Sequence, residues 1–285
     1  MNQNLLTEFG ATTRLGHSFR RLVVNYIDRC RLEDGGYFFA RIPPSSGADT
    51  HFAVKSLALM GMKPPRPEAV ANFFFRQIKE GTLSSIAGLF NAVEVINELG
   101  QITDDLRSYA QDQIMAWQNK AGGFGALENI YVEVPSELEE TYRAIRILKS
   151  TGATFDEQAV AGFVSSLLNH DGGYGRNRHS TLASTFYATE IHKLLGVDIQ
   201  KLAGTRAYFR RREKSWQIQF IEDLFWLVEG LANLGEKTVF PDRVIEFVLE
   251  CQRQGGGFAR ATIMGIPTLE YTFYALSVLK EMEVL

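Results

Sequence analysis

Three glutamates stand close together near the middle of the chain, in the run ELEET at residues 137–141. Carboxylates at such close range cannot all ionise easily, so one of Glu137, Glu139 and Glu140 can stay protonated and act as an acid. A structural explanation competes, because Ser136 and Glu139 have the S-x-x-E spacing of a capping box at a helix start. Acidic residues in a first helical turn are also favoured by the helix dipole. Both explanations stay open, and Glu139 can cap the helix while Glu140 faces an interior cavity.

A short basic loop, RNRH at residues 176–179, follows a Gly-Gly-Tyr turn and leads into a helix start. The guanidinium groups of Arg176 and Arg178, a flexible glycine backbone and free helical N–H groups together are suited to bind a diphosphate. The alternative is a solvated basic loop. A second basic cluster is expected to be a solvated face or a contact with a partner subunit, and its members are Arg206, Arg210, Arg211, Arg212 and Lys214.

Two other polar pairs stand at the starts of apolar segments. Asp49 lies two residues before His51, and Glu222 is adjacent to Asp223. Asp49 is alternatively an N-cap, and a lone histidine among apolar residues is more typical of the core than of a ligand or base. Adjacent carboxylates are costly to bury unless they are paired. Glu222 and Asp223 therefore either face a cavity or belong to a solvated helix end.

Aromatic residues are concentrated near the starts of the same apolar segments. Their number favours a cavity lined by rings, and the alternative is that they only fill the core. Such a lining buries a hydrocarbon chain, and the π faces stabilise a developing positive charge. The residues concerned are Phe52, Phe90, Tyr142, Phe186, Tyr187, Phe225, Trp226, Phe273 and Tyr274.

These side chains must be positioned by a repeated unit that runs along the chain. Gly-Gly-aromatic turns, 87, 50 and 84 residues apart, begin at Gly35, Gly122, Gly172 and Gly256. Apolar segments end at a second set of glycines, placed where a C′ glycine would stop a helix: Gly61, Gly100, Gly152, Gly196 and Gly235. The two markers indicate six units of about 42–50 residues, two of which lack the Gly-Gly turn.

Each unit contains one amphipathic helix and one helix that is apolar almost all round. Amphipathic examples are residues 67–79, 103–118 and 241–252. A helix without a polar face is normally buried on every side. The apolar segments are residues 51–60, 83–99, 141–148, 186–195, 220–234 and 271–279. The sequence therefore predicts one all-α domain over residues 1–285, an α/α toroid of six inner and six outer helices with essentially no sheet.

The composition narrows the classes of function. The chain has 30 Lys+Arg against 33 Asp+Glu, so its overall charge does not favour binding to nucleic acid or to a membrane surface. Cys30 and Cys251 are the only cysteines, which argues against a disulfide framework or a thiolate metal cluster and fits a reducing, cytoplasmic compartment. The first 21 residues lack the apolar core of a signal peptide. No apolar run approaches the length that spans a bilayer.

The pattern Gly-Gly-aromatic, loop, then Thr-aromatic-x-Ala-x-x-x-Leu resembles the repeat shared by protein prenyltransferase β-subunits and terpenoid cyclases. The best instances are residues 122–152, 172–196 and 251–282, and the similarity covers nearly the whole chain. The resemblance implies the toroid fold and an isoprenoid substrate, and the prenyltransferases add a helical partner subunit as an alternative. The resemblance is a weaker guide to the reaction than to the fold, because one fold hosts several chemistries.

The prenyltransferases that the chain resembles hold a catalytic Zn²⁺ with Asp, Cys and His. Placed on that pattern, these ligands fall on Ala183, Thr185 and Tyr271, none of which can replace them. Asp49 and His51 offer two donors elsewhere, which are too few for zinc. Zinc is therefore not expected as a cofactor, and Mg²⁺ is expected only together with a diphosphate substrate.

Class II terpenoid cyclases carry an Asp-x-Asp-Asp-Thr motif whose middle carboxylic acid protonates an alkene or epoxide. The chain has ELEET at the corresponding place, so the resemblance implies Glu137, Glu139 and Glu140 as catalytic residues. Glutamate in place of aspartate moves the acid by about one bond length. We therefore expect a cyclase-like isomerase or lyase that binds a prenyl or prenyl-diphosphate chain.

Two alternatives remain: a β-subunit-like prenyltransferase without the usual zinc ligands, and a non-catalytic toroid that binds a lipid or a protein. The substrate-binding residues expected for the leading hypothesis are Asp49, His51, Tyr142, Arg176, Arg178, Phe186, Tyr187, Asp223, Trp226, Tyr271 and Phe273.

Overall fold

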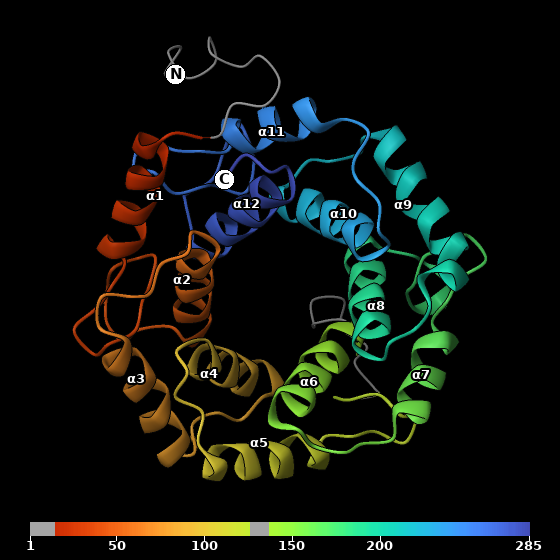
Figure 1. The fold of residues 1–285 in the computed structure, drawn as a ribbon, viewed down its shortest axis with the longest axis horizontal. Coiled ribbons are helices and arrows are strands. Elements are labelled where there is room, and N and C mark those ends of the chain that lie inside the picture. Colours follow the sequence, from red (N-terminus) through yellow and green to blue (C-terminus); the bar gives the residue numbers. More distant parts are fainter. Residues whose placement is uncertain (1–14, 126–136) are drawn as a thin grey trace. The chain divides into compact units, whose positions relative to one another are not determined.

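A computed structural model of the chain describes residues 15–125 and 137–285. Within these ranges it contains twelve α-helices and two short 3₁₀ turns, and β-structure is limited there to isolated bridges of single residue pairs (Figure 1). The all-α prediction is therefore confirmed. The chain forms two compact units: unit 1 comprises Met1–Pro65, Ile218–Phe225 and Thr238–Leu285, and unit 2 comprises Arg66–Gln217 and Trp226–Lys237. The expectation of a single domain stays a prediction.

Unit 2 is a two-layered arrangement of helices. Its inner helices α4 (Ile86–Glu98), α6 (Glu137–Thr151) and α8 (Leu182–Leu194) pack side by side. The outer layer, visible in Figure 1, contains α3 (Pro67–Lys79), α5 (Asp104–Ala116), α7 (Glu157–Ser166) and α9 (Ala203–Ser215). The inner helices carry most of the fully buried side chains, as expected for helices without a polar face.

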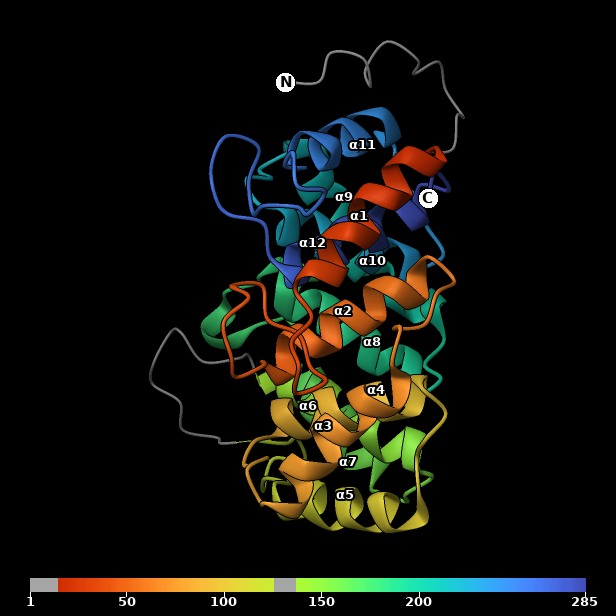
Figure 2. The same ribbon diagram turned by 90° about the vertical axis from the view of Figure 1, so that its left-hand side faces the viewer.

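Unit 1 contains the two ends of the described chain. Its inner helices α2 (Gly47–Leu59) and α12 (Leu269–Glu281) pack against each other, and α11 (Pro241–Glu250) packs on α12. Helix α1 (His17–Arg29) lies on the outside of α2 (Figures 1 and 2). Helix α10 (Ile221–Asn233) gives its first turn to unit 1 and its remainder to unit 2.

The apolar segments of the sequence coincide with α2, α4, α6, α8, α10 and α12, but several helices begin earlier than predicted. Helix α2 begins at Gly47 because the Ser46 hydroxyl accepts the Asp49 N–H at 3.2 Å. Ser46 is thus the N-cap. The alternative in which Asp49 caps this helix is wrong, because Asp49 is the third residue of the helix.

A threonine hydroxyl joins each Gly-Gly-aromatic turn to the inner helix that follows it. The Tyr37 N–H donates to Thr50 Oγ1 at 2.9 Å. The Phe124 N–H donates to Thr141 Oγ1 at 3.0 Å, and the same bond links Tyr174 to Thr185 and Phe258 to Thr272. All four threonines are fully buried. A buried hydrogen bond therefore joins turn and helix at all four places, although 11 to 17 residues separate the bonded partners.

The first glycine of each later turn lies directly on the backbone of an outer helix. At Gly122, with φ +92°, a Cβ atom would come within 2.4 Å of the Ala159 carbonyl oxygen on α7. At Gly256, with φ +93°, it would come within 2.1 Å of the Leu22 carbonyl oxygen on α1. Only glycine tolerates both this approach and this backbone conformation. The turn thus connects an inner helix to an outer one.

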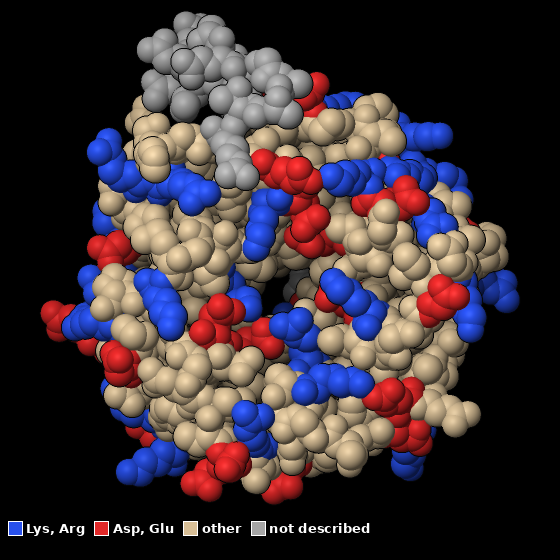
Figure 3. Space-filling model, viewed as in Figure 1, with Lys and Arg blue, Asp and Glu red and all other residues tan. Residues whose placement is uncertain are grey.

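Charges of both signs are interspersed over the face that Figure 3 shows, and that face has no broad basic patch of the kind that binds nucleic acid. The second basic cluster of the sequence lies on α9. There Arg210 pairs with Glu213 at 2.8 Å, and Arg206 pairs with Glu236 at 3.1 Å. None of the helices in the described ranges combines the length and apolar character needed to cross a bilayer.

Replacing Thr50 by valine tests the turn-to-helix bond. The Tyr37 N–H would stay buried without its acceptor, so Thr50→Val should lower the free energy of unfolding by about 1–3 kcal/mol. Thr50→Ser keeps the hydroxyl and should cost much less. Urea unfolding followed by circular dichroism measures both, and equal losses for valine and serine would show that the hydrogen bond is not what stabilises the turn.

Candidate functional site

The first glutamate of the predicted acidic cluster is held in an ion pair. Glu137, at the start of α6, accepts a hydrogen bond from Arg176 Nε at 2.5 Å and a second from Nη2 of the same guanidinium. The bond to Glu137 raises the pKa of Arg176. One arginine of the expected diphosphate loop is therefore already engaged by a carboxylate, while Arg178 is exposed in the same 3₁₀ turn (Arg176–Arg178).

The second glutamate accepts one hydrogen bond from its own helix and one from a neighbouring inner helix. Glu139 Oε1 receives Arg143 Nη2 at 2.6 Å and the Tyr187 hydroxyl at 2.8 Å. Burial and the nearby Glu139 charge raise the pKa of Tyr187 well above its usual value, so this phenol stays protonated and donates. Both donors thus bond the same carboxylate oxygen of Glu139. The proposed capping partner, Ser136, lies outside the described residues.

The third glutamate is the one that the site favours as an acid. Burial raises the pKa of Glu140, and the charges of Glu139 and Glu137 add to this while Arg143 opposes it. Its carboxylate lies against Gly125, where any Cβ atom would clash with it. Successive helical residues are about 100° apart, so Glu140 and Glu139 leave α6 in different directions. The cluster is therefore divided into two bonded carboxylates and one group that retains its proton more readily.

A continuous row of rings crosses the inner helices of unit 2. Phe90 on α4 lies 6.1 Å from Tyr142 on α6, measured between ring centroids. Tyr142 lies 5.5 Å from Tyr187 on α8, which lies 5.1 Å from Phe186. The row connects to the acidic cluster through the Tyr187 hydroxyl. These residues are among those that the sequence predicts either to line a cavity or to fill the core.

A buried ion pair lies one to two helical turns further along the same helices. Arg146 on α6 donates to Glu94 on α4 at 2.8 Å, and Glu94 is only 5% exposed. Burial raises the pKa of Tyr142, and the Glu190 carboxylate adds to this effect. Sequence reasoning missed Arg143 and Arg146. The Glu139–Arg143 spacing of four residues was a usable signal, whereas nothing local links Arg146 to Glu94.

Unit 1 contains a second aromatic cluster. Phe225 stacks on Tyr274 with ring centroids 4.5 Å apart, and Phe52 lies 5.6 Å from Phe273. His51 is buried and lies edge-on to Phe52 at 5.3 Å, as expected for a core histidine. In unit 2, the Trp226 indole Nε1 is buried and, among the described residues, has no hydrogen-bond acceptor.

Acidic side chains surround this second cluster. Burial raises the pKa of Asp49 to about 6, and the Glu270 carboxylate adds to the shift. Glu222 accepts Arg260 Nε at 2.5 Å, and the same guanidinium lies 4.0 Å over the Phe220 ring. Asp223 is half-buried beside Glu222 in the first turn of α10. Burial raises the pKa of Tyr271, and the Glu222 and Glu270 charges raise it further.

The positions that correspond to zinc ligands do not fit a metal. The Thr185 hydroxyl donates to the Thr181 carbonyl oxygen at 2.6 Å and accepts the Tyr174 N–H, so it is fully used in the fold. Ala183 has no donor atom, and Tyr271 keeps its proton. In the part of the chain that the structure describes, no three His, Cys, Asp or Glu side chains converge as ligands would.

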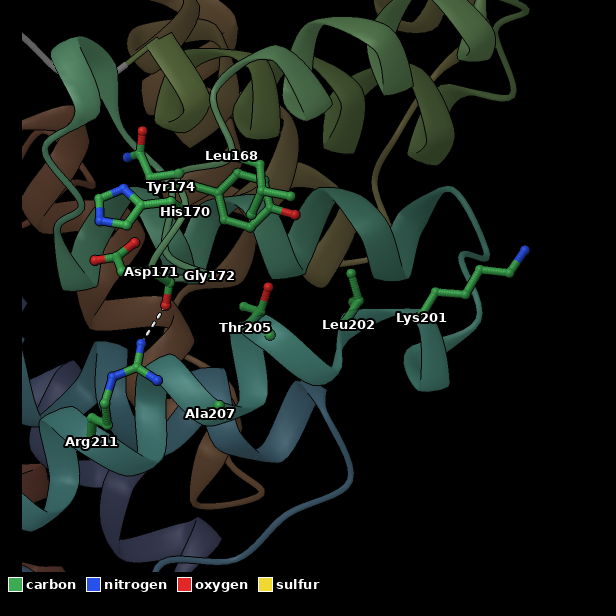
Figure 4. A pocket seen from close by; sticks show the side chains of 12 residues that line it. Leu168, His170, Asp171, Gly172, Tyr174, Lys201, Leu202, Thr205, Ala207 and Arg211 are labelled. Atoms are coloured by element: carbon green, nitrogen blue, oxygen red, sulfur yellow. Dashed lines mark hydrogen bonds between the residues drawn. The ribbon is translucent and has the colours of Figure 1, made fainter.

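A cavity of about 590 Å³ opens in the outer layer of unit 2, away from all of the predicted site residues (Figure 4). It lies between the turn at Gly172 and the start of α9, and Arg211 closes one side by donating to the Asp171 carbonyl oxygen. The Lys201 side chain points away from it in Figure 4. Local sequence patterns do not indicate this cavity, because it is formed by a turn and a helix start more than thirty residues apart.

Comparison with known proteins agrees with the helical repeat. The family model of the prenyltransferase alpha-alpha toroid domain matches residues 4–89, 75–216 and 219–283, which confirms the predicted toroid class. The chain is similar to Candida albicans protein geranylgeranyltransferase-I complexed with GGPP, with a TM-score of 0.73, 17% identity, and 92% and 90% of the two chains covered.

A type II terpene cyclase from Scytonema, solved with its product, gives a TM-score of 0.48 at 14% identity, and 96% and 83% of the chains are covered. The same cyclase solved with its substrate, geranylgeranyl dihydroxybenzoate, gives 0.47 at 13% identity, with 95% and 84% covered. No protein of curated function matches the chain.

The raised pKa of Asp49 predicts a pH-dependent cost to folding. Asp49 binds its proton more tightly in the fold, with a pKa of about 6 against 3.8. Its effect is therefore absent below about pH 4, and stability is lost as pH rises through 6. Asp49→Asn should remove a cost on the order of 2–3 kcal/mol at pH 7.5 and almost none at pH 4. Urea unfolding at both pH values checks this, and an equal effect at both would refute it.

Proposed function

The chain belongs to the prenyltransferase alpha-alpha toroid family, and from that premise we propose that it acts on an isoprenoid chain and starts its cyclisation by protonation. The hydrocarbon lies along the row of rings on α4, α6 and α8. Glu140 supplies the proton. The protein is thus a cyclase-like isomerase, as the ELEET run led us to expect.

The observation that carries this proposal is the hydrogen bond that joins the row of rings to Glu139 at the start of α6, one residue before Glu140. Phe90, Tyr142, Tyr187 and Phe186 form one row with centroid separations between 5.1 and 6.1 Å. The hydroxyl of Tyr187, the third ring of that row, is bonded to Glu139. A chain of isoprene units gains from burial against such rings, and their π faces stabilise positive charge.

The first chemical step needs a carboxylic acid, and Glu140 best meets that need. It transfers its proton to one carbon of a C=C bond, whose π electrons form the new C–H bond and leave a carbocation on the other carbon. The next C=C bond of the chain attacks that cation and closes a ring. Loss of a proton from the final cation to solvent ends the sequence, and solvent returns a proton to Glu140, so product and substrate are isomers.

The neighbouring bonded glutamates have supporting roles. Because Arg143 and Tyr187 hold Glu139 as a carboxylate, its negative charge opposes ionisation of Glu140 and attracts the developing cation. Glu137 keeps Arg176 close to the same helix start. A diphosphate, with Mg²⁺, would then have to displace the Arg176–Glu137 bond or use Arg178, so we place the recognition in the hydrocarbon.

A prenyltransferase-like subunit that works with a helical partner is the second candidate, favoured by the TM-score of 0.73 to protein geranylgeranyltransferase-I. Zinc chemistry does not fit this chain, since Ala183, Thr185 and Tyr271 offer no ligand set. We therefore derive no step through zinc.

Glutamine in place of Glu140 is the main test. Purified protein is incubated with geranyl, farnesyl and geranylgeranyl alcohols and diphosphates, and isomeric products are identified by gas chromatography and mass spectrometry. Glu140→Gln should lower turnover by about 10²–10⁴-fold, because the amide cannot give up a proton to the alkene. Wild-type turnover should fall as pH rises through the raised pKa of Glu140, since only the protonated form is active.

Two further variants complete this test. Glu80→Gln, an exposed glutamate of the same unit, should leave turnover unchanged. Glu139→Gln should reduce turnover less than Glu140→Gln does. A larger loss at Glu139 would make that residue the acid, and unimpaired turnover in both variants would show that the acid is not in this cluster.

Metal removal separates the two candidate functions. Cyclisation by Glu140 should survive treatment with 1,10-phenanthroline, and purified protein should contain far less than one zinc ion per chain. Stoichiometric zinc, measured by plasma mass spectrometry together with loss of turnover on chelation, would contradict the cyclase proposal and favour prenyl transfer.

A further inference from the structure

The connection between α11 and α12 exposes a run of apolar side chains. In the apolar loop, residues 259–267, Ile263 is 89% exposed, Met264 66% and Ile266 63%. Figure 2 shows this loop projecting from unit 1, to the left of α12. Exposing large apolar side chains in succession costs free energy in water unless another apolar phase covers them. The loop therefore exposes an apolar surface to solvent.

Hydrogen bonds hold this loop in its projecting conformation. Arg253 Nη2 donates to the carbonyl oxygens of Ala261 at 2.7 Å and Met264 at 3.0 Å. The Tyr26 hydroxyl of α1 donates to the Pro267 carbonyl oxygen at 2.8 Å. The loop is thus pinned at its middle and at its end. Its side chains are kept outward by the backbone and cannot easily fold back onto unit 1.

A second loop of unit 1 adds an apolar tip at the same end of the helices. In residues 38–46, Ile42 is 64% exposed. The Phe38 N–H donates to the carbonyl oxygen of Cys30, at the end of α1, at 2.8 Å. Both loops therefore lean on α1 and lead directly into the starts of the inner helices α2 and α12. Figure 2 shows both on the left side of unit 1.

Arginine side chains flank the apolar tips of these loops. Residues 35–48 and 251–269 contain Arg41, Arg253 and Arg260; Arg260 is paired with Glu222, and Arg41 is exposed. Apolar side chains flanked by arginine are typical of segments that lie in the interface of a bilayer with anionic lipids. The loops thus combine apolar tips with flanking arginine side chains.

We propose that unit 1 docks through these two loops on the surface of a bilayer that contains anionic lipids. Four projecting side chains on two narrow loops are too few for a stable protein interface, which buries roughly 1,200 Å² or more with close complementarity. Lipid headgroups and acyl chains, in contrast, rearrange around isolated tips. The purpose of docking rests on the proposed function, because an isoprenoid chain partitions into bilayers.

Vesicle sedimentation of the full chain tests the docking. Wild-type protein should sediment with phosphatidylcholine vesicles that contain phosphatidylglycerol, and less with phosphatidylcholine alone. The triple variant Ile263→Ser, Met264→Ser, Ile266→Ser should lower the partition coefficient at least roughly tenfold, because three apolar side chains no longer enter the interface. Ile42→Ser should give a smaller loss.

The control variant is Val239→Ser, which changes a 54% exposed apolar side chain of unit 1 outside both loops. It should sediment like wild type, and all variants should unfold at the wild-type temperature. The docking proposal would be overturned if the wild-type protein does not sediment with vesicles, or if the triple variant binds them as well as wild type does. So would a dimer that becomes a monomer in the triple variant, since the loops would then cover a second copy.

Turnover is measured separately on detergent-dispersed substrate. Absence of turnover with intact vesicle binding would reject the proposed reaction and leave the docking standing. Turnover in detergent without vesicle binding would do the reverse.

Discussion

The architecture depends on a buried hydrogen bond that is repeated at four places. In each, the N–H of the aromatic residue after two glycines reaches a threonine hydroxyl in the first turns of an inner helix. The same hydroxyl also donates a hydrogen bond to the carbonyl oxygen four residues earlier, at Thr50, Thr185 and Thr272. One side chain thereby satisfies a turn and a helix start together. Because the turn also lies on an outer helix, this bond fixes both layers at the helix end where the acidic residues stand.

That position explains the electrostatics of the acidic residues. The first turn of a helix favours negative charge through its unpaired N–H groups, yet burial at Asp49, Glu140 and Glu222 raises the pKa of each carboxyl. Neighbouring groups offset the cost of burying these carboxylates in different ways. Glu222 gains Arg260, and Glu139 gains Arg143 and Tyr187, whereas Glu140 gains less. Within one cluster, Glu140 therefore has fewer stabilising partners than Glu139 has.

Much of the fold followed from local patterns. Glycines at Gly61 and Gly152 ended helices where expected, with φ of +72° and +75°, because only glycine adopts that conformation without strain. Helix starts were less predictable. Asp49 resembled a cap, but Ser46 occupies that position three residues earlier, since either residue type can cap and only the backbone geometry decides between them.

The site was predictable in its residue types and not in its pairings. Tyr142, Phe186 and Tyr187 were expected to line one surface, and their rings do meet. The sequence did not indicate that Arg176 bonds to Glu137 across 39 residues, nor that Arg146 bonds to Glu94 across 52. Such partners are chosen by tertiary packing between helices, which no periodicity encodes. The exposed side chains of Ile263 and Ile42 were missed for a related reason. From sequence alone, a hydrophobic residue in a loop is indistinguishable from a core residue, and only the backbone path shows that it is exposed.

The division of unit 1 between the two ends of the chain has a consequence for biosynthesis. Helix α1 bonds to partners more than two hundred residues later, through Tyr26 to Pro267 and Arg29 to Gly255. About 150 residues separate the early part of unit 1 from its next segment at Ile218, which takes the ribosome roughly ten to thirty seconds to translate. Throughout that interval the nascent α1 and α2 lack their late partners, while the largely contiguous unit 2 can already fold. The emerging N-terminal helices therefore expose apolar side chains until their late partners have been synthesised.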